Sequence, residues 1–373
     1  MVTASAKRLV ISGYYGFKNS GDEAVLKSIL TALKQEANLA GITITPIVLS
    51  IDPEWTTSMY GVEAVHRMNM AEVRKAIRNS DGLISGGGSL LQDATGMKTI
   101  PYYLGILKIA QWMRKPTFIY AQGVGPVNKG LFRPFIASIF RKSSYISVRD
   151  TESAELLSSM GVPKERIEVV PDPVMGLPLK EGNVTVAWDG KDTLPTVGIS
   201  VRFWNSSRTE LKGLADGLTA LGKMMPVHFR FLPFHFPGDD EASRYVMDQM
   251  QVDAGGSQVS ITSEIVDPQA MLAEVNTCDA LVGMRLHSLI YAASRYVPML
   301  GISYDPKIDH FLARLGTVAV GTSEEVDPQI VASGLRNLLI EGEEWRNRNT
   351  ARIDVLKQEA RFPAARIVDY FKR

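Results

Sequence analysis

The chain has 373 residues, a length that suits two α/β domains better than one core. Hydrophobic residues make up 45% of it and charged residues 22%, which is typical of a globular protein and excludes a disordered one. The formal net charge is +1, so no overall basic field argues for nucleic-acid binding, and any anion site must be local.

Cysteine and histidine are too sparse for a disulfide framework or a structural zinc. Cys278 is the single cysteine, and the five histidines are scattered without a ligand pair. Residues 1–7 carry no signal-peptide core, and no window approaches the roughly 18 apolar residues of a spanning helix. We therefore expect a cytoplasmic protein with no metal and no cofactor; contact with the inner face of the cell membrane is compatible with the sequence.

The first half alternates short apolar segments with amphipathic ones, a pattern that predicts parallel strands connected by helices. The expected strands are 8–12, 42–49, a segment that runs into Gly86, 117–120, 145–148 and 167–170. The expected helices start near Gly21 and cover 70–78, 100–113, 131–141 and 152–160.

Residues 13–24 form a glycine-rich loop between the first strand and the first helix. The loop is neither Gly-x-Gly-x-x-Gly nor a Walker loop. Asp22 and Glu23 in the first helical turn would repel a bound anion. We therefore expect a sugar hydroxyl here, with Asp22 or Glu23 as hydrogen-bond acceptor or base; the alternative is a helix start selected for stability alone.

Residues 86–93, Gly-Gly-Gly-Ser-Leu-Leu-Gln-Asp, form the second glycine loop of this half. Three successive glycines let main-chain donors approach a ligand closely. Ser89, Gln92 and Asp93 are the side chains expected to line the site. A third loop with glycines, 121–126, follows the strand 117–120.

Arg149 directly follows the expected strand 145–148, which places it at the edge of the sheet where ligands bind. Asp150 or Thr151 is expected to cap the following helix. A surface ion pair of Arg149 with Asp150 or Glu152 is an equally good local interpretation.

Residues 176–195 lose periodicity and are interpreted as a linker, after which the alternation restarts. The expected strands are 196–201, 226–232, 257–261, 280–282 and 297–302. The expected helices are 208–222, 239–250, 268–275, 288–295 and most of 325–373, with Trp345, Ile353, Leu356 and Phe371 as candidates for burial.

The turn after the strand 280–282 carries Arg285 and His287. A guanidinium binds a carboxylate or phosphate through two parallel hydrogen bonds, and an imidazole transfers protons near neutral pH. The alternative is a capping and salt-bridge arrangement at a helix start. Arg202 and Lys307 also follow strands of this half.

Both halves predict parallel sheets whose ligand edges face each other across a cleft. One wall offers glycine loops and polar side chains, which suit a neutral polyhydroxy ligand. The other offers guanidiniums and an imidazole, which suit a small molecule bearing both a phosphate and a carboxylate.

Five motifs in this order resemble the polysaccharide pyruvyl transferase family, and the whole chain is similar to the bacterial CsaB-type secondary cell wall polysaccharide ketal-pyruvyltransferases. The motifs are Gly-Tyr-Tyr-Gly-x-x-Asn-x-Gly-Asp-Glu-Ala at 13–24, Gly-Gly-Gly-Ser-Leu-Leu-Gln-Asp at 86–93, Gln-Gly-Val-Gly-Pro at 122–126, Ser-Val-Arg-Asp-x-Glu-Ser at 147–153 and Arg-Leu-His-Ser at 285–288.

The resemblance implies a GT-B-like fold of two Rossmann-like domains. Residues 1–176 would form the acceptor side, 190–345 the phosphoenolpyruvate side and 346–373 a C-terminal helical segment. Phosphoenolpyruvate would be the donor and phosphate the leaving product. The acceptor would be a lipid-diphosphate-linked disaccharide, N-acetylmannosamine on N-acetylglucosamine, pyruvylated as a 4,6-ketal in cell wall biogenesis and S-layer anchoring.

The family's functional residues match positions of this chain. His287 would be the general acid, with Arg149 and Arg285 as catalytic and donor-binding arginines. Leu286, Arg202 and Lys307 complete the expected donor side. The expected acceptor contacts are Gly16, Asn19, Asp22, Gly88, Ser89, Gln92 and Asp93.

Two other functions fit the same architecture. A nucleotide-sugar-dependent glycosyltransferase would release free nucleotide rather than phosphate. A non-catalytic module for a phosphometabolite or polysaccharide would bind without forming product, and its binding would be indifferent to His287→Ala.

Overall fold

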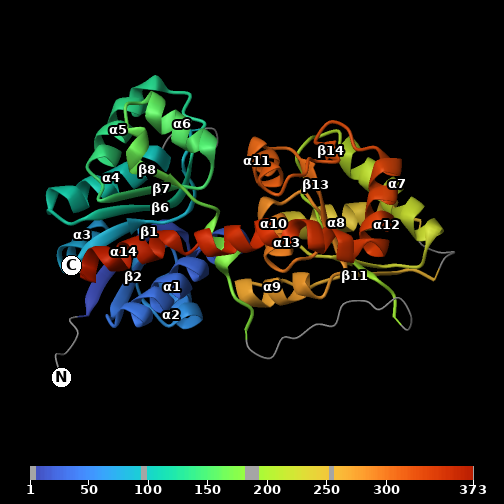
Figure 1. Ribbon diagram of the computed structural model, residues 1–373, viewed down its shortest axis with the longest axis horizontal. Coiled ribbons are helices and arrows are strands. Elements are labelled where there is room, and N and C mark those ends of the chain that lie inside the picture. Colours follow the sequence, from blue (N-terminus) through green and yellow to red (C-terminus); the bar gives the residue numbers. More distant parts are fainter. Residues whose placement is uncertain (1–5, 94–98, 181–192, 252–255, 373) are drawn as a thin grey trace. The chain divides into compact units, whose positions relative to one another are not determined.

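The computed structural model describes residues 6–93, 99–180, 193–251 and 256–372, and the chain divides into two compact units (Figure 1). Unit 1 comprises Met1–Leu177 and Leu356–Arg373, and unit 2 comprises Pro178–Val355. Each unit is built on a parallel sheet with helices packed against it. The predicted α/β class with two parallel-sheet domains is therefore confirmed.

The sheet of unit 1 has the order β3-β2-β1-β4-β6-β7-β8, and β5 pairs with β6. Its strands are β1 (Lys7–Tyr15), β2 (Ile44–Ser50), β3 (Glu63–His66), β4 (Gly82–Ser85), β5 (Gly88–Leu91), β6 (Thr117–Val124), β7 (Tyr145–Val148) and β8 (Ile167–Val169). Its helices are α1 (Ser20–Ala40), α2 (Pro53–Tyr60), α3 (Met70–Arg78), α4 (Thr99–Trp112), α5 (Arg133–Arg141), α6 (Thr151–Ser159) and α14 (Phe362–Lys372), with 3-10 turns η1 (Gly130–Phe132), η2 (Lys164–Arg166) and η3 (Pro173–Gly176).

The central strands of unit 1 are apolar on both faces because helices cover both. Every residue of β6 is buried, from Thr117 to Val124. One face packs against α3, α4 and α5 in a single hydrophobic cluster. On the other lie α1 and α14, and the rings of Tyr370 and Phe371 contact the ring of Phe118 on β6. A continuous apolar run is the pattern of a parallel strand buried on both sides.

The sheet of unit 2 has the order β11-β10-β9-β12-β13-β14. Its strands are β9 (Thr196–Ser200), β10 (His228–Phe231), β11 (Gln258–Ile261), β12 (Ala280–Gly283), β13 (Met299–Ser303) and β14 (Gly321–Thr322). Its helices are α7 (Thr209–Met224), α8 (Gly238–Gln249), α9 (Pro268–Asn276), α10 (Leu286–Ser294), α11 (Pro306–Arg314), α12 (Pro328–Ile340) and the larger part of α13 (Gly342–Glu359).

In each sheet the first strand of the unit lies in the interior of the sheet, and the order in which later strands are added reverses once. In unit 1 the chain moves outward from β1 to β3 and then returns to place β4 on the other side of β1. In unit 2 the same reversal separates β9 from β12. Ligands of open α/β sheets bind at this switch point, outside the carboxyl ends of the strands. The glycine loops after β1 and β4, and the turn that carries Arg285 and His287, all lie at switch points.

Several element boundaries differ from the sequence expectation. Gly88–Leu91, expected as loop, forms the short strand β5, and residues 121–124, also expected as loop, continue β6. Helix α10 starts at Leu286, two residues earlier than expected, so Arg285 is its N-cap and His287 lies in its first turn. The helices α2 and α11 and the strands β3 and β14 were not expected from the sequence.

The C-terminal third is helical as expected, and Trp345, Ile353 and Leu356 are buried while Phe371 is half-buried. Its last residues, from Leu356 onward, belong to unit 1. Of the expected linker 176–195, residues 181–192 lie outside the described part of the chain. Among the helices of the described ranges, none combines the length and the apolar character that crossing a bilayer requires.

Candidate functional site

At the switch point of unit 1 the side chain of Tyr15 covers the glycines of both loops. A Cβ at Gly86 would lie 2.0 Å from Oη of Tyr15, and a Cβ at Gly13 would lie 2.2 Å from its Cζ. The backbone N–H of Gly86 donates to the carbonyl of Ser12 at 2.8 Å. These two glycines therefore make room for a buried tyrosine, a packing reason that the sequence pattern did not reveal.

The first glycine loop is closed by Glu23 and Asn19. Glu23 is fully buried, and its carboxylate accepts hydrogen bonds from the N–H of Gly16 at 2.8 Å and from the hydroxyl of Tyr60 at 2.8 Å. Burial raises the pKa of Glu23, and these hydrogen bonds partly oppose the rise. Asn19 caps α1 by accepting from the N–H of Gly21 at 3.1 Å. Glu23 and Asn19 thus hold the loop, which disfavours Glu23 as a base.

Asp22 lies between the two glycine loops. A Cβ at Gly88, a residue with φ of +92°, would lie 3.3 Å from Oδ1 of Asp22. The negative charge of Asp22 also contributes to the raised pKa of Tyr15, which is due mainly to burial. Asp22 is half-buried, so this carboxylate combines access to solvent with a place at the switch point.

Asp93 organises the chain that follows β6. Its carboxylate accepts from the backbone N–H and side-chain amide of Asn128, at 3.0 and 3.1 Å, and from the N–H of Lys129 at 2.8 Å. The hydrogen bond from the backbone of Asn128 is the main reason that the pKa of Asp93 is lowered. A carboxylate with a lowered pKa is a weak base, so the structure favours a loop-holding function for Asp93.

Arg149 is buried at the carboxyl end of β7. Its Nη2 donates to Oγ of Ser89 at 2.7 Å, and its Nη1 lies 3.5 Å from Oδ2 of the buried Asp172. Its Nε lies 3.6 Å from Oδ2 of Asp150, which also caps α6 as expected. The guanidinium lies against Gly123, where a Cβ would approach its Nε to 2.8 Å. Two predicted site residues, Arg149 and Ser89, are therefore brought together.

Buried polar atoms gather at the same edge of the sheet. Ser12 on β1, Ser85 on β4 and Gln122 on β6 are buried near the carboxyl ends of adjacent strands. The hydroxyls of Ser12 and Ser85 and both atoms of the Gln122 amide have no hydrogen-bond partner among the described residues. Buried polar groups are normally satisfied, so unmet groups at a switch point indicate a place for a polar ligand or water.

Arg67 at the end of β3 was missed by the sequence analysis. It is buried, and it donates to the carbonyl of Gly13 at 3.0 Å and to the hydroxyl of Tyr103 at 3.2 Å. Its guanidinium carbon lies 4.4 Å from the ring centroid of Tyr102 and 5.4 Å from that of Phe17. Arg67 therefore anchors the first glycine loop, with the desolvated cation stabilised by aromatic faces.

The candidate site of unit 2 is assembled from the carboxyl ends of four neighbouring strands, β10, β9, β12 and β13. Arg285, the N-cap of α10, forms a two-point ion pair with the fully buried Asp239 in the first turn of α8. Its Nε donates to Oδ2 at 2.9 Å, and its Nη2 donates to Oδ1. Oδ2 also accepts from the N–H groups of Phe234 and His235, at 3.2 and 3.0 Å. Asp239 therefore fixes the guanidinium.

His235, which follows β10, is a second imidazole at this edge. Burial lowers its pKa, and the nearby Arg285 and Arg202 lower it further, while Asp239 raises it. Its Nδ1 is buried without a hydrogen-bond partner among the described residues. His287, half-buried in the first turn of α10, lies two residues after Arg285. Leu286, between them, is buried.

Arg202 and Lys307 have different surroundings. Nη1 of Arg202 donates to the hydroxyl of Tyr304 at 2.9 Å, and its guanidinium carbon lies 5.2 Å from the ring centroid of the exposed Trp204. Nζ of Lys307 lies 2.9 Å from Oδ2 of Asp305. The hydroxyl and the aromatic rings around Arg202 carry no negative charge, so they do not neutralise its guanidinium. The ammonium of Lys307, in contrast, is neutralised by the carboxylate of Asp305. Arg202 is the better anion ligand of the two.

The sequence analysis missed Asp239, His235, Tyr304 and Asp172 as site residues. Each follows a strand or starts a helix at a ligand edge, and that position was the available signal. Asp172 belongs to unit 1, whereas Asp239, His235 and Tyr304 belong to unit 2. These three form, with Arg202, Arg285 and His287, a cationic, half-buried surface that can bind a small polyanion and supply a proton donor.

Comparisons with known proteins give one family match and several matches of fold. The sequence model of the polysaccharide pyruvyl transferase family matches residues 19–306. A comparison with curated proteins found no match.

Among solved structures, the chain is similar to a putative UDP-N-acetylglucosamine 2-epimerase from Listeria monocytogenes, with 10% identity, a TM-score of 0.65 and coverage of 99% of this chain and 96% of that chain. It is also similar to UDP-GlcNAc 2-epimerase from Neisseria meningitidis bound to UDP-GlcNAc, with 12% identity, a TM-score of 0.62 and coverage of 98% and 99%. A glycosyltransferase from Rickettsia africae ESF-5 matches with 12% identity, a TM-score of 0.62 and coverage of 98% of both chains. These similarities show a fold of the GT-B glycosyltransferase and epimerase type.

Proposed function

The chain belongs to the polysaccharide pyruvyl transferase family, and on that premise we propose that it transfers the enolpyruvyl group of phosphoenolpyruvate onto two hydroxyls of a sugar, forming a ketal and releasing phosphate. The proposed acceptor is N-acetylmannosamine, ketalised at its 4- and 6-hydroxyls, in a lipid-diphosphate-linked precursor of a secondary cell wall polysaccharide. The observation that carries the proposal is the pairing of Arg285 and His287 at the start of α10, inside the family match and at the switch point of unit 2.

We assign phosphoenolpyruvate to the cationic edge of unit 2. Arg285, held by Asp239, retains Nη1 for an anion, and Arg202 offers a second guanidinium beside His235. A phosphate and a carboxylate on one small molecule are the anions that such guanidiniums bind in paired hydrogen bonds. Leu286 and Lys307 would line the same edge. The catalytic and donor-binding function of Arg149 rests on the family resemblance.

The acceptor is assigned to the switch point of unit 1. The supporting observations are the unmet hydroxyls of Ser12 and Ser85 and the unmet amide of Gln122, which suit sugar hydroxyls. Asp22 beside Gly88 is the carboxylate proposed to take a hydroxyl proton, because it is half-buried at the switch point, whereas Glu23 is fully buried and the pKa of Asp93 is lowered. Gly16, Asn19, Ser89 and Gln92 complete this proposed acceptor site.

The proposed reaction begins with proton transfer from His287 to the methylene carbon of phosphoenolpyruvate, which makes C2 cationic. A sugar hydroxyl adds to C2 and loses its proton to a carboxylate. The C2–O bond to phosphate then breaks, and the second hydroxyl bonds to C2 and loses its proton, which closes the ketal. A positioned general acid contributes typically about 10²–10⁴-fold to such a step. Fixed guanidiniums stabilise the phosphate as charge accumulates on it.

The deciding experiment measures phosphate release from phosphoenolpyruvate with and without a lipid-diphosphate disaccharide, together with the new ketal methyl signal by NMR. We expect both products only when donor and acceptor are present together. Free nucleotide released from a UDP-sugar, with no phosphate from phosphoenolpyruvate, would instead identify a nucleotide-sugar glycosyltransferase. Binding of phosphoenolpyruvate without either product would identify a non-catalytic module.

A further inference from the structure

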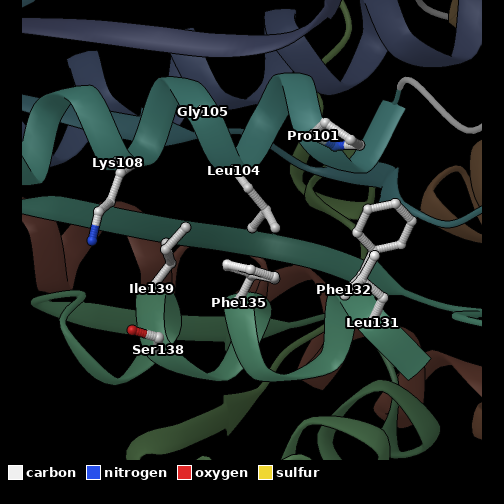
Figure 2. Close-up of a pocket in the computed structure, with 9 residues that line it drawn as sticks. All are labelled: Pro101, Leu104, Gly105, Lys108, Leu131, Phe132, Phe135, Ser138 and Ile139. Atoms are coloured by element: carbon white, nitrogen blue, oxygen red, sulfur yellow. The ribbon is translucent and has the colours of Figure 1, made fainter. Parts of the chain in front are cut away.

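An open apolar groove lies in unit 1 between α4 and the segment formed by η1 and α5 (Figure 2). Its volume is about 370 Å³. The lining residues of α4 recur at helical spacing, so they lie along one face of that helix. The lining residues of the other side are spaced in the same way. Figure 2 shows Leu104 on α4 pointing toward Phe135 on α5. The lining residues are Pro101, Leu104, Gly105 and Lys108 on one side and Leu131, Phe132, Phe135, Ser138 and Ile139 on the other.

Large apolar side chains around this groove face solvent. Leu131 is 72% exposed and Phe135 57% exposed. Trp112 continues the α4 stripe one turn beyond Lys108 and is 74% exposed. The ammonium of Lys108 lies 5.6 Å from the ring centroid of Trp112. Contiguous exposed apolar surface of this kind marks an interaction site rather than ordinary surface variation.

The charge of this part of the chain has one sign. Residues 99–148 contain seven lysines and arginines and no aspartate or glutamate, although the whole chain has nearly equal numbers of both signs, 41 and 40. Lys108 lines the groove, and the exposed Lys129 and Arg133 flank Leu131 in sequence. One wall of the groove therefore carries a lysine, and exposed cations precede and follow Leu131 in the segment that forms the other wall.

We infer that this face of unit 1 docks on the surface of an anionic phospholipid bilayer. Leu131, Phe135 and Trp112 enter the boundary between headgroups and acyl chains, and Lys108, Lys129 and Arg133 contact lipid phosphates. Exposed aromatic and aliphatic side chains with lysine and arginine around them are the composition of interfacial membrane-binding surfaces.

The same observations disfavour two other occupants. A second copy of this chain in a two-fold dimer would place the same patch on both partners, so the cations would face each other. The centres of protein–protein interfaces are depleted of lysine, whereas lysine is favoured where apolar stems meet a wet, anionic headgroup layer. The inference is independent of pyruvyl transfer, because it requires neither donor nor acceptor.

The test is co-sedimentation of the full chain with vesicles of phosphatidylcholine mixed with phosphatidylglycerol, and with vesicles of phosphatidylcholine alone. We expect binding to the anionic vesicles that weakens as salt is raised, and much weaker binding to the neutral ones. Leu131→Gln combined with Phe135→Gln should reduce partitioning at least tenfold. Lys108→Gln should reduce it by about fivefold for the one cation removed.

Matched controls lie elsewhere in unit 1. Leu39→Gln and Lys34→Gln should each leave partitioning unchanged. Leu39 is 80% exposed near the end of α1, and Lys34 is exposed on the same helix. Unaltered circular dichroism and melting temperature would show that each variant is folded. Equal partitioning of the parent and the Leu131/Phe135 variant, or no partitioning of the parent, overturns the inference. So does a variant that changes oligomeric state but not vesicle binding, because the occupant is then a second copy.

Discussion

Asp239 binds Arg285 through both carboxylate oxygens while accepting two backbone N–H groups, so one buried side chain fixes both a loop and a guanidinium. An arginine held at Nε and Nη2 presents its remaining edge in one orientation. Orientation fixed before binding reduces the entropy that a ligand must lose. Asp239 is thus a positioning residue in the proposed donor site.

Asp239→Asn should weaken both the fold and donor binding. In Asn an NH₂ group replaces one of the two acceptor oxygens, so it faces an N–H group that Asp239 had accepted. That buried N–H group loses its acceptor, which should lower the free energy of unfolding by about 1–3 kcal/mol. We expect the KM for phosphoenolpyruvate to rise about tenfold, with a smaller effect on kcat. The control is Asp240→Asn, since Asp240 pairs with the exposed Arg244 in an i,i+4 pair, and exposed ion pairs contribute little to stability. Equal KM values for the two variants would contradict the positioning function.

Arg285→Lys should cause a large loss of donor binding despite keeping the charge. An ammonium is a point donor and does not reproduce the two parallel hydrogen bonds of the fork, either to Asp239 or to an anion. We expect the dissociation constant for phosphoenolpyruvate to rise about 10–100-fold, measured by calorimetry. A near-normal constant would remove Arg285 from the donor site.

His287→Ala should abolish turnover while largely sparing donor binding. We expect kcat to fall about 10²–10⁴-fold if the imidazole is the general acid. Phosphoenolpyruvate affinity, measured on the same preparation, should change little. His235→Ala is the comparison, because His235 is the other imidazole at this edge and its lowered pKa makes it a poor proton donor at neutral pH. A larger kcat effect from His235→Ala than from His287→Ala would reverse the assignment.

The lowered pKa of His235 also predicts how stability depends on pH. Between its pKa in the folded protein and its ordinary value near 6.5, the unfolded chain binds more protons than the folded one. The free energy of unfolding therefore rises with pH across that interval. The stability that His235 contributes is lost as the pH falls through the same interval. Urea titrations below pH 7 should show a shallower pH dependence for His235→Gln than for the parent. Parallel pH profiles would show that His235 does not carry this linkage.

Gly86→Ala should destabilise unit 1 through Tyr15. The new methyl group would lie 2.0 Å from Oη of Tyr15, and overpacking of this kind costs about 1–3 kcal/mol. Tyr15→Phe alone should be nearly neutral, because the buried hydroxyl has no hydrogen-bond partner among the described residues. When Gly86→Ala and Tyr15→Phe are combined, the ring atom nearest the new methyl group is Cζ of residue 15, at 3.2 Å. Much of the stability lost in Gly86→Ala should therefore be recovered. A double-mutant cycle by denaturant unfolding measures this coupling, and strict additivity would contradict it.

Much of the framework was predictable because parallel strands buried on both faces produce continuous apolar runs. The strands Tyr145–Val148 and Ala280–Gly283 and the helix Met70–Arg78 fall at or within one residue of their expected positions. The helices α2 and α11 were missed because each is a single short helix that starts at a proline after a strand, where the pattern indicates a turn. The Asp150 cap was expected and is present.

The contacts that organise the candidate sites were less predictable, since they join residues far apart in the chain. Asp239 is 46 positions from Arg285, and Ser89 is 60 positions from Arg149. Local spacing contains no information on such pairs. It also did not distinguish glycines that approach a ligand from those, such as Gly86, that accommodate a tyrosine ring.

The helix α14 has a consequence for how the protein is made. The rings of Tyr370 and Phe371 cover Phe118, and Arg366 lies 3.3 Å from Glu168, so a segment translated after unit 2 completes unit 1. Unit 1 would leave the ribosome with one sheet face covered by α1 but lacking α14, and it would gain this last helix only after unit 2 has been translated. Expressing the amino-terminal half alone should therefore give an aggregation-prone product, and adding residues 356–373 in trans should rescue it.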